Sequence, residues 1–174
     1  GSGDPADKTT TGTITVQAPD GIASVTIGGT TFTVAQLDAF TSGSPSADID
    51  TGEGELRITG ISDKTGAPGA PVSADVSYTY TLKAAITNAT PADTESTDTI
   101  ALVVTDNSAT PKTGTGNLLI QIVDDVPTAS ADSNSITKGA ATVTGNAFTN
   151  DSIGADGAAL AGPITGITGG TPGT

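Results

Sequence analysis

The sequence predicts an all-β protein, an antiparallel β-sandwich of about seven strands. Short runs rich in Val, Ile and Thr alternate apolar and polar side chains, and turn residues separate these runs at intervals of roughly 8–15 residues. Only one stretch, Ala35–Phe40, has the apolar spacing of a helix, and it is at most about two turns long. Because no substantial helices alternate with the strands, a parallel α/β sheet is not expected.

The first part of the chain is expected to form three strands, at Thr11–Gln17, Ile22–Ile27 and Thr30–Val34. Each shows the period-two alternation of a strand that is buried on one face. A Pro-Asp-Gly sequence at positions 19–21 supplies the backbone preferences of a turn between the first two strands. The pair Gly28 and Gly29 is typical of a two-residue hairpin turn, which joins the second strand to the third.

The remaining strands are expected at Glu55–Ile61, Val72–Ala85, Thr99–Thr105 and Gly116–Val123. The alternation is clearest in the second of these, where Tyr78 and Tyr80 share an apolar face that we expect to point into the core. The polar segments Gly43–Gly54 and Ser62–Pro71 are expected to be loops, since Gly, Pro, Ser and Asp favour turns.

Composition and charge limit the classes of function. The net charge of −13, from 19 acidic and 6 basic residues, argues against binding to nucleic acid, which needs a cationic surface, and against adhesion to anionic lipid. No apolar run approaches the ~18 residues of a membrane span, so membrane insertion is not expected, and no signal peptide is present. The chain has no Cys, and therefore no disulfide framework. A metal ion is a usual stabiliser of a domain with so small a core.

Catalysis is not expected. The chain has no His and no Cys, so the common nucleophile–base pairs are not available to it. Counting residues does not exclude a carboxylate pair for glycoside hydrolysis. However, the chain holds only 2 Tyr and 3 Phe that could stack against a sugar, and both tyrosines are predicted to face the core.

We expect three regions along the chain. Residues 1–10 are polar and are interpreted as a tag and linker, because Gly1-Ser2 resembles a cloning scar. Residues 11–126 are expected to form the β-sandwich. Residues 127–174 are rich in Ala, Gly and Thr and hold too little apolar material to fold alone. This last region either packs on the sandwich or begins a truncated repeat.

The junction between sandwich and final region is the first candidate metal site. The apolar run Leu118–Val123 is followed at once by Asp124 and Asp125, and Pro127 then keeps the chain extended. Carboxylate oxygens at such a junction are the ligands that Ca²⁺ prefers. Asp132 or Asp151 could complete the oxygen shell. The alternative is a solvated acidic linker without a metal.

A second candidate is the acidic segment that contains Asp48, Asp50 and Glu53. Its start resembles an EF-hand loop, but an EF-hand needs glycine at its sixth position and a bidentate Glu at its twelfth. Glu53 and Thr59 occupy those positions here. The three acids could still donate oxygens together with a neighbouring loop. Otherwise they belong to a turn whose carboxylates face water.

Two further groups of acids have less support. Asp93, Glu95 and Asp98 are interpreted as a solvated loop rather than as a ligand set. Asp151 and Asp156 lie in a Gly- and Asn-containing segment, which fits metal ligands and plain Asx-turns equally well.

Six segments, taken together and in order, resemble a known family. They are VTIGGTTFTVAQLDAF, IDTGEGELRITG, VSYTYTL, TDTIALVVTD, LLIQIVDDVPTASAD and GNAFTNDSIGADGA. This series is similar to the tandem repeats of giant type I-secreted bacterial adhesins, the BapA- and VCBS-type modules of the RTX adhesin group. The resemblance covers roughly residues 11–168, and the combination is more specific than any single motif.

The resemblance implies a cadherin- or immunoglobulin-like sandwich on the bacterial cell surface. In such adhesins the modules act as Ca²⁺-stabilised extenders, which give length and rigidity for adhesion or biofilm formation. The implied partners are neighbouring repeats of the same chain, and residues 127–174 would begin the next repeat. The isolated fragment is expected to be monomeric. The alternative is a domain that itself binds a carbohydrate or protein ligand through its loops.

The sequence departs from the family at one place. Relatives usually carry an acidic run such as TDADGD between the last two strands, whereas this chain has TDNSATPK at positions 105–112. One carboxylate, that of Asp106, remains there, and Lys112 adds a positive charge. A Ca²⁺ site in that hairpin is therefore not expected.

Overall fold

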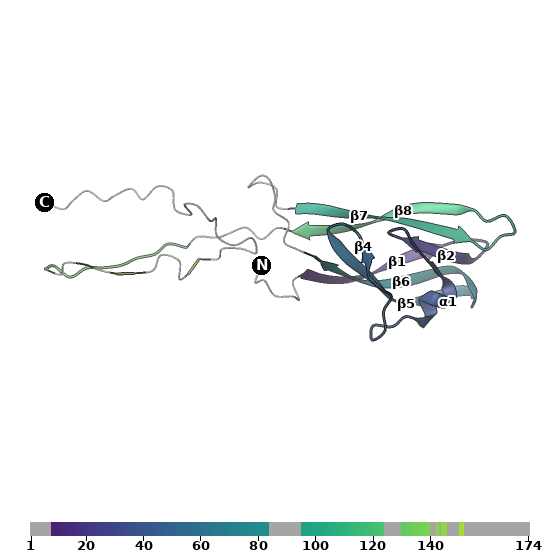
Figure 1. Ribbon diagram of the computed structural model, residues 1–174, viewed down its shortest axis with the longest axis horizontal. Coiled ribbons are helices and arrows are strands. Elements are labelled where there is room, and N and C mark those ends of the chain that lie inside the picture. The colour runs from purple at the N-terminus through teal and green to yellow at the C-terminus, as the bar shows by residue number, and fades with distance from the viewer. Residues whose placement is uncertain are drawn as a thin grey trace. The chain divides into compact units, whose positions relative to one another are not determined.

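The computed structural model describes residues 8–83, 95–123, 130–139, 142, 144, 145, 150 and 151. Contacts divide the chain into two compact units. One unit is Asp4–Asp124, and the other comprises Gly1–Gly3 together with Asp125–Thr174. The first unit is a β-sandwich, whose labelled elements appear in Figure 1.

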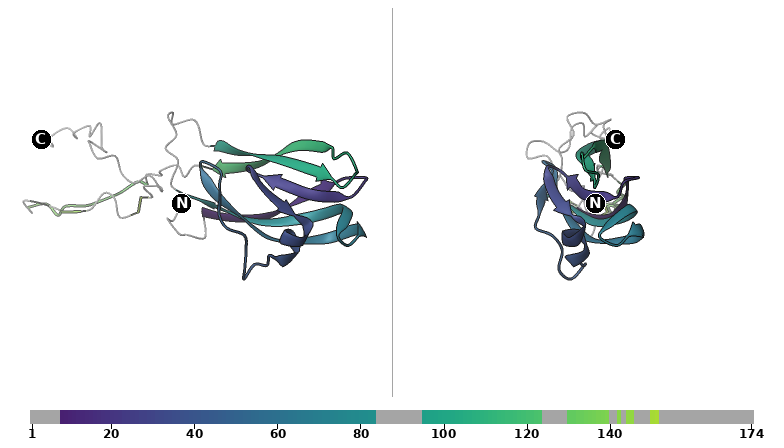
Figure 2. Two further views of the ribbon diagram at one scale, coloured as in Figure 1. Left: turned by 45° about the vertical axis from the view of Figure 1, so that its right-hand side comes forward. Right: turned by 90° about the vertical axis from the view of Figure 1, so that its right-hand side faces the viewer.

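The sandwich has two antiparallel sheets of four strands each, in the orders β1-β6-β5-β4 and β3-β2-β7-β8. The two layers are seen separately in Figure 2. The prediction of an all-β sandwich is thereby confirmed. The strands are β1 (Thr9–Gln17), β2 (Ile22–Ile27), β3 (Thr30–Thr33), β4 (Ile49–Asp50), β5 (Gly54–Ala67), β6 (Ala70–Leu82), β7 (Glu95–Asp106) and β8 (Thr113–Val123).

The first hairpin and the single helix form where the sequence predicts them. Gly28 and Gly29 have φ angles of 54° and 81°, the positive values that a tight hairpin turn between β2 and β3 requires. Helix α1 (Val34–Ala39) follows β3 directly. Its start is fixed by a capping box, in which Thr33 accepts a hydrogen bond from the Gln36 backbone while the Gln36 side chain accepts one from the Thr33 backbone.

Two segments expected to be loops contain strand. β4 lies in the polar segment before Gly54 and pairs with β5 over two residue pairs. β5 continues to Ala67, so the expected loop at Ser62–Pro71 is wrong: its first six residues belong to β5, and four of these six pair with β6. At these turn-forming residues the pairing of β5 with β6 shifts register, as in a β-bulge, and Asp63 and Gly66 have positive φ angles. Cross-strand pairing therefore outweighs the local turn preference here.

The core fills the space between the sheets with aliphatic side chains. Its fully buried members include Ile22, Ile27, Leu37, Leu56 and Ile58. Tyr78 and Tyr80 point into this core as predicted. Two glycines make room for their rings, because a Cβ on Gly12 or Gly54 would lie 2.5 Å or 2.2 Å from the nearest tyrosine atom.

The described part of the second unit contains no strand. The Ile and Thr content of residues 135–137 favours a short strand, but these residues lie in irregular chain. Hydrogen bonds that involve side chains join described residues of this unit that lie 10 to 21 positions apart. Asp151 accepts from the Ser130 backbone at 2.7 Å, and Asn134 donates to the Thr144 carbonyl at 3.1 Å.

Candidate functional site

A buried carboxylate joins the two sheets near one end of the sandwich. Asp98 of β7 is 5% exposed, and its Oδ2 accepts a hydrogen bond from the Tyr80 hydroxyl at 2.8 Å and from the Thr51 hydroxyl at 2.6 Å. Tyr80 belongs to β6 and Thr51 follows β4, so both donors come from the opposite sheet. We call Asp98, Tyr80 and Thr51 the inter-sheet brace.

Thr51 also closes the turn between β4 and β5. Its backbone N–H donates to the Gly54 carbonyl at 3.0 Å, and the Gly54 N–H donates to the Thr51 hydroxyl oxygen at 3.1 Å. The single hydroxyl proton is directed at Asp98, the shorter contact, and the hydroxyl oxygen also lies 2.9 Å from the Gly54 carbonyl oxygen. The acceptor site on Asp98 is therefore coupled to the geometry of this turn. The brace fixes a loop as well as the spacing of the sheets.

Burial and the neighbouring carboxylate change the acidity of the tyrosine. Burial raises the pKa of Tyr80 far above its usual value, and the hydrogen bond to Asp98 raises the pKa further. The hydroxyl therefore stays protonated and remains a donor throughout the physiological pH range. This chemistry suits a permanent structural contact, because the Tyr80 hydroxyl keeps the proton that it donates to Asp98.

The interpretation of Asp98 as part of a solvated loop is wrong. It lies inside β7, on the same face as Ile100, Leu102 and Val104, which the period-two alternation of the sequence already places together. That alternation is the signal that could have identified Asp98 as an inward-facing carboxylate. Asp93 lies outside the described residues, and Glu95 begins β7.

The acids of the β4–β5 segment lie on the surface in ion pairs. Asp48 pairs with Arg57, and Asp50 pairs with Lys83. The hydrogen bond from Arg57 holds the pKa of Asp48 below its usual range, and the Lys83 side chain with the Gly52 backbone N–H does the same for the pKa of Asp50. Glu53 is exposed in the turn. Each aspartate therefore has its own cation, and the two do not converge on one point with Glu53 as a ligand set would.

The other predicted metal ligands are distributed as follows. Asp124, Asp125 and Asp156 lie outside the described residues. Asp132 is exposed, and Asp151 accepts from the Ser130 backbone. Over the described parts of the chain, no three acidic side chains are grouped so that they could hold a metal ion.

Asp106 holds the loop between β7 and β8 through hydrogen bonds. Its Oδ1 accepts hydrogen bonds from the Ser108 hydroxyl at 2.7 Å and from the Lys112 backbone N–H at 2.9 Å. These bonds lower the pKa of Asp106 and close the loop between β7 and β8. The expectation that this hairpin lacks a metal site stays a prediction, and the structure supplies a stabiliser that needs no metal.

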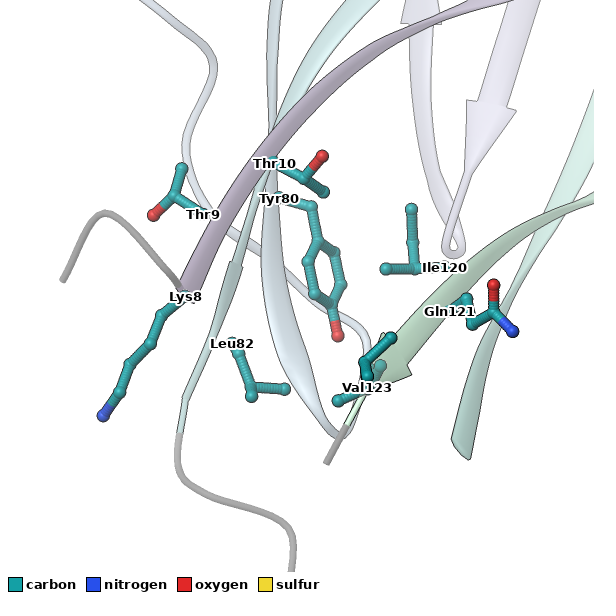
Figure 3. Close-up of a pocket in the computed structure, with 9 residues that line it drawn as sticks. Lys8, Thr9, Thr10, Tyr80, Leu82, Ile120, Gln121 and Val123 are labelled. Carbon is teal, nitrogen blue, oxygen red and sulfur yellow. The ribbon is translucent and has the colours of Figure 1, made fainter. Parts of the chain in front are cut away.

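Two separate hollows lie on one side of the sandwich, between strands β1 and β8. One hollow of about 240 Å³ lies between Lys8–Thr10 and Ile120–Val123 and has Tyr80 and Leu82 on its wall. Figure 3 shows these side chains around it. A second hollow of about 240 Å³ lies between Ile14–Gln17 and Gly114–Gly116.

No helix in the described part of the chain is long and apolar enough to cross a membrane. Comparisons with family models, with curated proteins and with solved structures found no match to this chain.

Proposed function

We propose that this chain is a spacer module of a repetitive bacterial cell-surface adhesin, which gives length and rigidity and does not itself carry out a reaction. The observation that carries the proposal is the inter-sheet brace. Its buried carboxylate binds hydroxyl groups from the opposite sheet and from the turn after β4, and so connects the two sheets and that turn. The ordered sequence resemblance to extender repeats supports the same function, as does the division into a folded sandwich and a second unit.

The proposal includes Ca²⁺ as the ion that stabilises the junction after the sandwich. A net charge of −13 opposes a compact arrangement of successive modules, and a divalent cation relieves this repulsion. Asp124 and Asp125 are the residues we assign to this role, from their adjacency in the sequence. The ion-paired Asp48 and Asp50 are poor ligands by comparison, because each would first have to leave a cation.

The described aromatic residues offer little support for the rival, a ligand-binding adhesin domain. Phe32, Tyr78 and Tyr80 are buried, and Phe40 packs edge-on against Phe32 with ring centroids 5.7 Å apart. Phe148 lies outside the described residues. Sugar-binding surfaces commonly stack the sugar on an exposed aromatic ring, and no described side chain of this chain provides one. We therefore propose the spacer function alone.

A thermal melt tests the calcium-dependent part of this function. Unfolding is followed in EGTA, in millimolar Ca²⁺ and in millimolar Mg²⁺. We expect a rise in Tm that is specific to Ca²⁺, since an ion that binds only the folded state stabilises it by mass action. The double variant Asp124→Ala with Asp125→Ala is expected to lose part of that rise, whereas Asp63→Ala, an exposed acid on β5, should keep it. Identical melting curves in all three solutions would overturn the calcium-stabilised spacer.

A further inference from the structure

We infer that the inter-sheet brace carries tension across the sandwich and acts as a mechanical latch. The brace keeps the sandwich closed while the chain is pulled gently, and a stronger pull breaks the brace and lengthens the chain. The inference goes beyond the proposed function, because it concerns how the sandwich responds to a pull on the chain at its two ends. This response belongs to the fold whatever the role of the chain.

The chain enters and leaves the sandwich at the same end (Figure 1). Residues 8–10, at the start of β1, line one hollow together with residues 120–123, at the end of β8. Residues 14–17 of β1 line the other hollow together with residues 114–116 of β8. The two strands therefore lie side by side and run in opposite directions, and a pull on the chain acts on two neighbouring points of the sandwich.

The two strands that receive the pull belong to different sheets. β1 is paired with β6, and β8 is paired with β7. Because packed sheets lie about 10 Å apart, a pull on the two chain ends turns the sandwich until the force runs from one sheet to the other. This force acts across the strands and separates the sheets at this end first. Resistance to opening therefore depends on contacts between the sheets near the two chain ends.

The inter-sheet brace joins the strands that lie next to the two chain ends. Thr10, near the start of β1, is the register partner of Tyr80. Ile120, near the end of β8, is the register partner of Asp98. The Tyr80 hydroxyl donates to Asp98 Oδ2 at 2.8 Å, so this hydrogen bond connects the two register partners across the sheets. Tension passes from β1 to Tyr80, across the brace to Asp98, and from there to β8.

A second donor secures the same carboxylate. Thr51 donates to Asp98 Oδ2 at 2.6 Å, from the turn between β4 and β5. Hydrogen bonds to a carboxylate are about twice as strong as those between neutral groups. Direct packing between β1 and β8 adds less at this end, because the side chains there line a hollow of about 240 Å³ and do not fill it (Figure 3).

Loss of the brace under tension lets the terminal strands peel away. In an antiparallel pair the hydrogen bonds are perpendicular to the strands, so a strand that is lifted at one end breaks its bonds one pair after another. The pairs of β1 with β6 and of β8 with β7 are therefore loaded in turn and not together. The brace sets the force at which the sandwich opens, and full opening lengthens the chain between residues 8 and 123 by roughly 400 Å.

Force spectroscopy of the full chain tests the latch. The chain has no native cysteine, so handles attached at Lys8→Cys and Val123→Cys define where the force is applied. Handles at Lys8→Cys and Thr110→Cys give the control geometry. Residue 110 precedes β8, whose start lies beside the end of β1, so this second pull runs along the strands. The opening rate at constant force is measured in both geometries for the wild-type sequence, Tyr80→Phe and Ile22→Val.

Ile22→Val is the matched control for a general loss of stability. Ile22 is fully buried in β2 and pairs with Asp106, at the end of β7 farther from the brace. Removal of its methyl group lowers the stability of the fold by an amount comparable to the loss of one hydrogen bond. Its contacts still hold when the brace breaks, and contacts that are intact in the transition state leave the opening rate almost unchanged.

In the pull between residues 8 and 123, we expect Tyr80→Phe to raise the opening rate about tenfold, the effect of one lost hydrogen bond to a carboxylate. Ile22→Val should raise this rate by less than about twofold. In the control geometry, the effect of Tyr80→Phe should be much smaller than tenfold. Equal effects of the two variants in the first pull, or an equal effect of Tyr80→Phe in both geometries, would overturn the latch. Neither result would change the calcium-dependent melt, so the two proposals fail separately.

Discussion

Asp98 is a buried carboxylate on which the contact between the two sheets depends. It brings a carboxylate into the core and receives two hydroxyl donors from the opposite sheet. A buried carboxylate without such donors would be strongly destabilising, because desolvation of a charge is costly. The brace therefore ties the spacing of the sheets to the presence of Tyr80 and Thr51.

Removal of one donor tests this dependence. Tyr80→Phe is expected to lower the free energy of unfolding by about 1–3 kcal/mol, since it leaves the buried Asp98 with one hydroxyl donor fewer. The matched control is Tyr78→Phe. Tyr78 also points into the core, but its hydroxyl makes no hydrogen bond to the described residues. Chemical denaturation measures both variants, and equal losses would contradict a specific role for the brace.

Alkaline pH should weaken the fold through the same residue. The pKa of Tyr80 is raised above its unfolded value of about 10, so the unfolded chain gives up this proton first as the pH rises. The stability that Tyr80 contributes is therefore complete below pH ~10 and is lost progressively above it. Burial also raises the pKa of Tyr78, which adds to the effect.

Unfolding midpoints measured from pH 8 to pH 11.5 follow this change. We expect the midpoint of the wild-type chain to fall above about pH 10, and that of Tyr80→Phe to fall less steeply over the same range. Identical slopes in the two chains would contradict the assignment to Tyr80.

The sequence predicts the burial of the two tyrosines but not that of Asp98. The alternation around Tyr78 and Tyr80 predicts their inward direction, and the structure confirms it. The same alternation extends through Asp98, but an acidic residue beside other acids looks like part of a loop. The hydrogen-bond partners of Asp98 lie 18 and 47 positions away along the chain, so no local sequence pattern could have predicted them.

At the scale of elements, glycine placement decides how closely β5 can approach the brace. A Cβ on Gly54 would lie 2.2 Å from the Tyr80 ring, well inside any allowed contact. Gly116 of β8 is also in a strand, but a Cβ there would meet nothing within 4 Å. The two glycines thus form a natural pair of test sites, one crowded and one open.

We expect Gly54→Ala to destabilise the fold by about 1–3 kcal/mol, because either the Tyr80 ring or the turn must move. Gly116→Ala should be neutral or slightly stabilising, since it restricts the unfolded chain without a clash. Thermal or chemical unfolding of the two variants provides the comparison. A neutral Gly54→Ala would show that the tyrosine adapts freely and that the brace is loose.

The strands differ in how well their sequence predicts them. β2 forms over the predicted residues, Ile22–Ile27, because its alternation and its glycine turn agree. β5 runs six residues into a segment that reads as loop, since pairing with β6 holds Ser62–Ala67 extended through bulges. β4 pairs over only two residues, which is too short for a period-two pattern to emerge.

At the scale of the whole molecule, the sandwich is one compact unit and most of the remaining chain belongs to a second. The all-β class followed from strand alternation alone. The structure bears unequally on the metal ligands expected from the sequence. Asp48 and Asp50 are ion-paired, whereas a metal-binding role of Asp124 and Asp125 stays a prediction. Lysine and arginine partners distant in sequence from an acid are set by sheet register, which composition does not reveal.

The proposed spacer function makes a prediction about tandem copies. Arrays of one, two and four copies of this chain, each joined directly to the next, should gain a constant length with every added copy. The gain should be complete in millimolar Ca²⁺ and smaller in EGTA, because unrelieved repulsion between acidic junctions leaves successive modules without a fixed arrangement.

Small-angle X-ray scattering of these arrays reports the maximum dimension in solution and therefore measures this gain in length. We predict a maximum dimension that rises linearly from one to four copies in Ca²⁺, and an array carrying Asp124→Ala with Asp125→Ala in each copy that stays at the EGTA value. A maximum dimension that levels off after two copies would mean that the modules collapse on one another, and this would contradict a spacer.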